Sequence, residues 1–122
     1  MASRYDRHAA RFKALGHPVR LQILDMLRRG ETCVCHLETA LSRRQAYISQ
    51  QLMILREAGL VEARKDGLKV FYRIVDPVVV DLLDTVLGPT PTLGLDHISG
   101  CPCPHCVAMS HEATKETLYV NR

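Results

Sequence analysis

The apolar residues of this chain change their spacing once along its length, and that change limits the folds available to it. From residue 4 to residue 59 they recur every three or four positions, which is the period of an amphipathic helix. In the segment LVEARKDGLKVFYRIV (60–75) they alternate with polar residues on both sides of Asp66-Gly67, the strongest short-range signal for a β-hairpin. Helical spacing returns after Asp76-Pro77, so the sequence predicts one hairpin set among helices.

Glycine, proline and capping residues divide the helical part of the sequence. Pro18 is placed to open the second helix, and Thr32 is placed to cap the third. The expected helices cover residues 4–15, 18–30, about 33–40, 44–59 and 78–88. Two helices joined by a tight turn, the second followed by a basic hairpin, describe a winged helix-turn-helix. The predicted fold class is therefore mainly α with a β-hairpin wing.

The length of 122 residues suits one compact domain and a tail. We expect residues 1–88 to form the DNA-binding and dimerisation domain. Residues 89–122, rich in Pro, Gly and Thr, read as an extended tail that holds a cysteine cluster. The apolar stripes of the first helix (Tyr5 to Leu15) and of the last helix (Val79 to Val86) exceed what so small a domain can bury. They predict a homodimer.

Cysteine usage points to thiol chemistry in a reducing compartment. No apolar run approaches the ~18 residues of a membrane span, and the N-terminal segment lacks the apolar region of a secretory signal. A cytoplasmic location follows as an expectation. Five cysteines in such a compartment are better explained as ligands or redox sensors than as a disulfide framework.

The second helix of the predicted helix-turn-helix has an outward face without acidic residues. Its side chains are those that read base edges and phosphates, and the hairpin adds cations for the phosphate backbone. A polar helix face is by default only a solvated surface, and a net charge of +3 does not demand nucleic acid. The combination of turn, acid-free face and basic wing nevertheless favours double-stranded DNA as the partner. The candidate contacts are Arg43, Arg44, Gln45, Tyr47, Ser49, Gln50 and Gln51 on the helix, and Arg64, Lys65 and Lys69 on the wing.

Two segments carry a resemblance to a known family. The stretches ALGHPVRLQILDMLRRGETCVCHLETAL and YISQQLMILREAGLVEARKDGLKVFYRIV resemble the ArsR/SmtB family of metal-responsive repressors, over about residues 6–87. The resemblance implies a homodimer with one recognition helix in each major groove, and a DNA complex that is weakened when an ion binds. Arg44 and Tyr47 differ from the small hydroxylated residues common at these positions, so the operator sequence is not specified.

Cys33 and Cys35 are the first candidate ligands for that ion. In a regular helix two residues at this spacing point about 200° apart, so both can share an ion only if Cys33 precedes the helix. The family's arsenic sensors often carry another cysteine three residues further on, where this chain has Glu38. Cys101, Cys103 and Cys106 of the tail can supply the missing sulfurs. Thiolate sets suit As(III) and Sb(III) first, and Cd(II), Pb(II) and Zn(II) next.

Other interpretations of these residues stay open. The Cys33–Cys35 pair could be small buried apolar residues, and the tail could be a self-contained zinc site or a disordered end. We expect His105 to be a bystander and His17 and His36 to be surface or capping residues. The last helix contains no histidine, so we expect no zinc site there, and solvated side chains for Asp81 and Asp84.

These observations predict a DNA-binding transcriptional repressor that leaves its operator when a thiophilic ion binds. One alternative is a thiol redox or persulfide sensor of the same fold, in which Cys35 and a tail cysteine form a reversible disulfide. Another is a metal-buffering or carrier protein, although a carrier has no use for an acid-free helix beside a basic wing. We expect neither an enzyme nor an organic substrate, because the sequence pairs no nucleophile with a base and has no phosphate loop.

Overall fold

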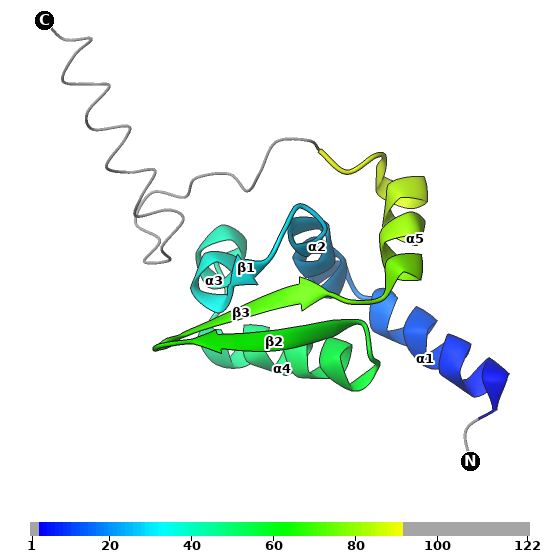
Figure 1. Cartoon of the computed structure of the whole chain (residues 1–122), viewed down its shortest axis with the longest axis horizontal. Coiled ribbons are helices and arrows are strands. Elements are labelled where there is room, and N and C mark those ends of the chain that lie inside the picture. Colours follow the sequence, from blue (N-terminus) through cyan, green and yellow to red (C-terminus); the bar gives the residue numbers. More distant parts are fainter. Residues whose placement is uncertain (1–2, 92–122) are drawn as a thin grey trace, which may run out of the picture.

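The computed structural model describes residues 3–91, which form helices packed against a small sheet (Figure 1). α1 and α2 are followed by a short strand, a helix pair, a hairpin and a last helix. In chain order the elements are α1 (Arg4–Leu15), α2 (Pro18–Leu27), β1 (Thr32–Cys33), α3 (Val34–Leu41), α4 (Gln45–Glu57), β2 (Val61–Asp66), β3 (Lys69–Ile74) and α5 (Pro77–Leu87). The predicted winged helix-turn-helix is confirmed. No helix within residues 3–91 has the length and apolarity to cross a membrane.

Local chemistry explains where three of the helices begin. Ser3 and Asp6 form a reciprocal capping box at the start of α1. His17 caps α2 by accepting a hydrogen bond from the backbone N–H of Val19, and Pro18 occupies the first turn, which lacks intrahelical acceptors. Asp76 caps α5 in the same way, accepting from the N–H of Val78. The expected capping role of His17 is therefore confirmed.

The start of α3 differs from the prediction. Thr32 was expected to cap this helix, but it lies in β1 opposite Tyr72, and its hydroxyl donates to the carbonyl of Gly30. Cys33 is the N-cap residue, with extended backbone (φ −70°, ψ 143°) and no capping hydrogen bond from its side chain. The two-residue strand β1 turns the hairpin into a three-stranded antiparallel sheet in the order β1-β3-β2. A strand of two residues is too short to show a period, so this strand could not be predicted from the sequence.

The hairpin turn lies one residue beyond the predicted position. Asp66 pairs with Lys69, so the two-residue loop is Gly67-Leu68 rather than Asp66-Gly67. Gly67 takes φ +62°, a value that glycine adopts without the steric cost of a side chain, at the first position of the loop. Leu68 at the tip is 99% exposed. The wing therefore ends in an apolar residue with basic residues on either side.

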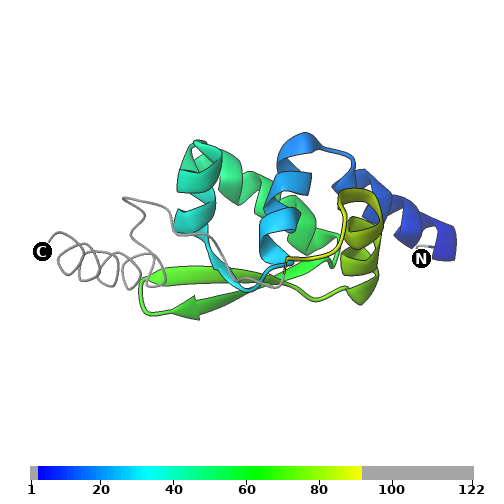
Figure 2. The same cartoon turned by 90° about the horizontal axis from the view of Figure 1, so that it is seen from above.

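The core joins α2, α3, α4, α5 and the start of the wing, whereas α1 lies largely outside it. Ala14 is the one buried residue of α1. α1 and α5 lie at one end of the molecule, and α3 and the hairpin tip lie at the other (Figures 1 and 2). The side chains with 0% exposure are Ile23, Leu24, Leu37, Ile48, Leu52, Leu55 and Val79.

Candidate nucleic-acid interface and cysteine pocket

The predicted reading surface is formed by the first half of α4 and the turn before it. Ser42 ends α3 in the left-handed conformation (φ 51°), which turns the chain sharply into α4. The guanidinium carbon of Arg43 lies 5.3 Å from the ring centroid of the half-buried Tyr47, which is a cation–π contact. The exposed candidates on this surface are Arg43, Arg44, Gln45, Ser49 and Gln50.

Gln51 does not belong to this surface, contrary to its predicted place on the outward face. It is buried (6% exposed), and its Oε1 accepts a 2.9 Å hydrogen bond from the guanidinium of Arg20. Arg20 also donates to the carbonyls of Ala14 and Lys13 at the end of α1. Sequence spacing held the signal, because Gln51 is three residues from Ile48 and four from Leu55, both of which face the core. Arg20, which the sequence analysis did not single out, thus ties α1 to α4.

The basic residues of the wing are in three different situations. Lys65 is exposed. Arg64 forms an ion pair of 2.5 Å with Glu31, and its guanidinium carbon lies 4.8 Å from the Phe71 ring centroid. Hydrogen bonds from Arg64 lower the pKa of the Glu31 carboxyl, and Glu31 raises the pKa of Arg64 in return. Part of the positive charge expected from Arg64 is therefore already compensated within the protein.

Lys69, the third of these cations, lines a cavity of about 330 Å³ between α3, the start of α4 and the hairpin. Both Cys33 and Cys35 line the same cavity, Cys33 as a buried side chain and Cys35 as a half-buried one. The extended backbone of Cys33 makes this possible, because Cys33 precedes the helix and is therefore not turned about 200° away from Cys35. The lining residues, hereafter the cysteine pocket, are Cys33, Val34, Cys35, Glu38, Gln45, Ser49, Leu68, Lys69, Val70 and Tyr72.

The cysteine pocket does not contain a complete metal site of its own. Among residues 3–91 no group of three or more His, Cys, Asp or Glu side chains is arranged to hold a metal ion. Glu38 lines the pocket, and its spacing three residues after Cys35 on a helix could have indicated this. Cys101, Cys103 and Cys106, together with His105, lie outside the described residues. His36 was expected at the surface or at a cap, but it is 1% exposed.

An apolar groove lies at the other end of the molecule, between α1 and α5. It has a volume of about 270 Å³ and is lined by Phe12, Leu15, Gly16, Leu21, Leu82, Leu83 and Val86. Phe12 is 59% exposed and Val86 is 75% exposed. Val79 and Leu83, on the same predicted stripe, are buried inside the protomer instead. Tyr5, Phe12 and Val86 are the large apolar residues of the predicted stripes that are exposed, and Val78 and Leu87, just outside the second stripe, are exposed as well.

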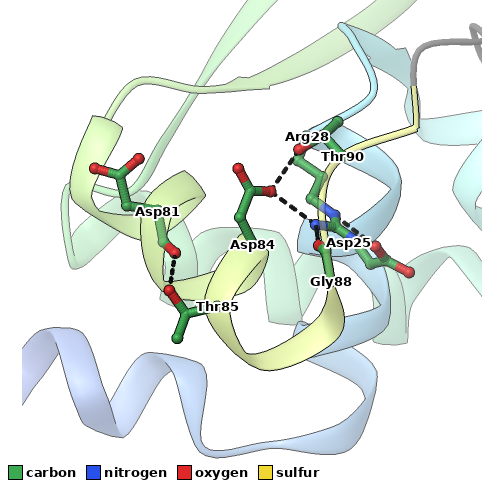
Figure 3. A network of polar contacts seen from close by, with 7 residues as sticks. All are labelled: Asp25, Arg28, Asp81, Asp84, Thr85, Gly88 and Thr90. Atoms are coloured by element: carbon green, nitrogen blue, oxygen red, sulfur yellow. Dashed lines mark hydrogen bonds and ion pairs between the residues drawn. The ribbon is translucent and has the colours of Figure 1, made fainter.

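Arg28 joins the ends of α2 and α5 (Figure 3). Its side chain is 4% exposed, and it forms ion pairs with Asp25 and Asp84 and donates to the carbonyl of Gly88. Asp84 was expected to be solvated, but it accepts hydrogen bonds from Thr90 and Arg28, which lower its pKa. Asp81 is exposed, as predicted. This network fixes the direction in which the chain leaves α5.

The sequence and the arrangement of helices and wing match known proteins. The sequence model described as bacterial regulatory protein, arsR family, matches residues 17–63. An uncharacterised HTH-type transcriptional regulator of Methanocaldococcus jannaschii is 44% identical over 84 residues, which are 68% of this chain and 94% of that protein. A biofilm growth-associated repressor of Agrobacterium fabrum is 38% identical over 86 residues, 70% of this chain and 74% of that protein.

A solved structure shows the same fold. It is the solution structure of a homodimeric winged helix-turn-helix DNA-binding domain from Mycobacterium bovis, described as a possible ArsR-family transcriptional regulator. That domain superimposes with a TM-score of 0.64 at 40% identity, covering 68% of this chain and 77% of the other.

Proposed function

This chain belongs to the ArsR family as a DNA-binding transcriptional repressor, and we propose that it acts as a homodimer that leaves DNA when its cysteines capture a soft, thiophilic ion. The family consists of DNA-binding regulators rather than enzymes. The proposal assigns residues 1–88 to DNA binding and dimerisation and residues 89–122 to a cysteine-containing tail. As(III) and Sb(III) are the first candidates for the ion, followed by Cd(II), Pb(II) and Zn(II).

DNA binding is assigned to the exposed start of α4 and to the wing. Arg44, Gln45 and Gln50 have the guanidinium and amide groups that bind base edges in a major groove, and the ammonium of Lys65 is suited to a phosphate. Gln51 is left out of this assignment because it is buried. The exposed apolar residues of α1 and α5 supply the dimer surface, as expected for a relative of the homodimeric Mycobacterium bovis domain. Half-sites about 34 Å apart follow from such a dimer.

One observation carries the sensing part of the proposal: Cys33 and Cys35 line one cavity, although a regular helix would turn them apart. Two thiols beside Glu38 leave a soft ion short of a third sulfur. We assign that sulfur to the tail, through Cys101, Cys103 or Cys106. Glu38 contributes a hard oxygen, which a soft ion takes less readily than a sulfur.

The alternative that the pocket also favours is a thiol redox switch. A cavity with two thiols and no complete metal site suits oxidation of Cys35 and a tail cysteine to a disulfide, with two electrons and two protons passing to a peroxide or persulfide. Such a switch would act without any metal. A metal carrier is disfavoured, because carrying an ion requires no DNA-reading surface.

A DNA-release assay on the reduced full chain tests the proposal. Fluorescence anisotropy of a labelled duplex, selected by the chain from a randomised pool, would be followed during titration with arsenite, antimonite, Cd(II), Pb(II) and Zn(II). At least one ion should weaken the affinity for DNA by about 5–150-fold, which is the range that typical coupling free energies produce. Cys35→Ser should bind DNA normally but not respond, because serine is a poor soft-metal ligand.

Two further arms separate the alternatives. Truncation after Gly100 should also abolish the response, and a response at wild-type ion concentrations would show that the tail supplies no ligand. The redox alternative predicts that hydrogen peroxide releases the DNA, that dithiothreitol reverses this release, and that no ion releases it. That outcome would show that the signal is oxidation and not an ion.

A further inference from the structure

The cysteine pocket shares residues with the predicted DNA-reading surface. Gln45 and Ser49 belong to the exposed start of α4, and Lys69 belongs to the wing, yet all three line the cavity that holds Cys33 and Cys35. In the sequence the DNA-reading residues and the two cysteines lie in separate segments. In the folded chain one wall of the sensing cavity is part of the reading surface.

The position of the cavity defines what bound DNA would do to it. In a winged helix-turn-helix, the start of the recognition helix enters the major groove and the wing approaches the adjacent backbone. Residues of both these elements and of α3 line the cavity, and Leu68 of the wing tip is among them. A duplex that contacts Gln45 and Lys69 together would therefore span the opening of the cavity.

We propose that the cysteine pocket lies inside the DNA footprint, so that DNA and any occupant reaching past Gln45 and Ser49 exclude one another directly. The inference rests on the proposed function for the DNA-binding face, but not on the identity of the ion. The cysteine pocket has a volume of about 330 Å³, which is at the lower end of the range for small-molecule sites. A small occupant fits within the cavity, whereas a larger one protrudes into the space that DNA would fill.

Direct exclusion is reciprocal, which makes it measurable from both sides. Bound DNA should shield Cys35 from thiol reagents, and a thiol adduct should weaken DNA binding in proportion to its size. A movement of helices alone would give no dependence on adduct size. Cys33, which is 3% exposed, is expected to react slowly in either state.

The first experiment measures protection. In a full-length Cys101→Ser/Cys103→Ser/Cys106→Ser chain, iodoacetamide alkylates Cys35 as the thiolate displaces iodide and forms a thioether. Saturating duplex should slow this reaction by about tenfold or more. The matched control adds Cys35→Ser and Glu57→Cys, which moves the thiol to the exposed far end of α4, about 18 Å along the helix axis from Gln45. Its alkylation rate should change little with DNA.

The second experiment grades the adduct. The acetamide adduct of Cys35 fits the cavity, whereas the adduct formed when the thiol adds across the double bond of fluorescein maleimide does not. The larger adduct should lose DNA affinity by about tenfold more than the smaller one, while circular dichroism reports an intact fold for both.

Equal alkylation of Cys35 with and without bound DNA, or equal affinities of the two adducts, overturns the inference and leaves the proposed function intact. A chain that binds no duplex at all overturns both.

Discussion

α1 and α4 are helices of almost the same length with opposite relations to the rest of the protomer. α4 places Ile48, Leu52 and Leu55 in the core at 0% exposure. α1 buries only Ala14, and its aromatic residues Tyr5 and Phe12 are 81% and 59% exposed. Both helices show an apolar stripe at helical spacing, so the stripe alone does not say what covers it.

The apolar face of α4 is buried within one protomer, whereas that of α1 is left exposed and can be covered by a partner. The apolar face of α4 packs against other elements of the same protomer. α1 and α5 carry exposed apolar side chains in a continuous region around a groove, the kind of surface that marks a protein interface. Arg20 connects the two regions through its hydrogen bonds to the end of α1 and to Gln51 of α4.

The largest expected effect tests the burial of α4. Leu52→Ala should lower the free energy of unfolding by about 2–5 kcal/mol, because it removes contacts and leaves a cavity in the core. Met53, its neighbour, is 58% exposed, and Met53→Ala should change stability by no more than about 0.5 kcal/mol. Urea denaturation measures both variants. Equal losses would contradict the inward placement of Leu52.

The next effect tests the partner surface. Phe12→Glu with Val86→Glu puts two charges on the exposed α1–α5 surface and should yield monomers by sedimentation. Losing simultaneous engagement of two half-sites should cost about 100-fold or more in DNA affinity. Met53→Glu, which adds a charge to an exposed apolar position on α4, should remain dimeric. A double variant that stays dimeric would move the interface elsewhere.

The third effect compares two glutamines of α4, of which Gln45 is exposed and Gln51 is buried. Gln45→Ala should cost about 1–3 kcal/mol on the selected operator with no change in melting temperature, because Gln45 is exposed. Gln51→Ala should cost about 1–3 kcal/mol of folding stability, since Arg20 loses a buried acceptor, with no change in base preference. Binding to a set of single-base operator variants, together with thermal melts, distinguishes the two. A change of base preference in Gln51→Ala would contradict its structural role.

A smaller effect compares two cations of the wing. Lys65→Ala should weaken all DNA sequences alike and reduce the salt dependence of binding by about one phosphate contact. Arg64→Ala should change that dependence less, because Glu31 already compensates Arg64. Plots of affinity against salt concentration provide the test, and equal slopes for the two variants would show that Arg64 leaves Glu31 when DNA binds.

The smallest effect is the pH dependence of the Arg64–Glu31 pair. The pKa of Glu31 is lowered in the folded chain, so its stabilising contribution is full above its unfolded pKa of about 4.3 and is lost as pH falls through the folded value. Glu31→Gln should therefore differ from wild type in stability by a constant amount between about pH 5 and about pH 7. The difference should shrink below about pH 4. Denaturation midpoints across this range provide the measurement.

Regular periods and local caps supported the sequence prediction, and a contact between residues far apart in the sequence explains its error at Thr32. His17, Pro18 and Asp76 marked helix starts through bonds that each residue makes locally. Thr32 has the chemistry of an N-cap, but pairing with Tyr72, a residue about 40 positions away, outweighs that local preference. Tertiary pairing of this kind leaves no pattern in two residues.

The candidate site shows the same division. The exposed polar residues at the start of α4 could be read from composition and order alone. The burial of Gln51 could have been inferred from its helical spacing to Ile48 and Leu55, whereas that of His36 could not, because it depends on the packing of α3. The cysteine pocket joins residues 33–38, 45–49 and 68–72, three segments that only the folded chain brings together.

The pairing of β1 with β3 also has a consequence for the order of folding events. Thr32 and Cys33 pair with Tyr72 and Phe71 across a loop of about 40 residues that contains α3 and α4. Closing so long a loop costs chain entropy before its few contacts form, whereas the hairpin and the helix turns need only local contacts. We therefore expect this short ladder to close late and to open early. Cys33 thus belongs to the segment whose backbone amides should exchange with solvent ahead of the core.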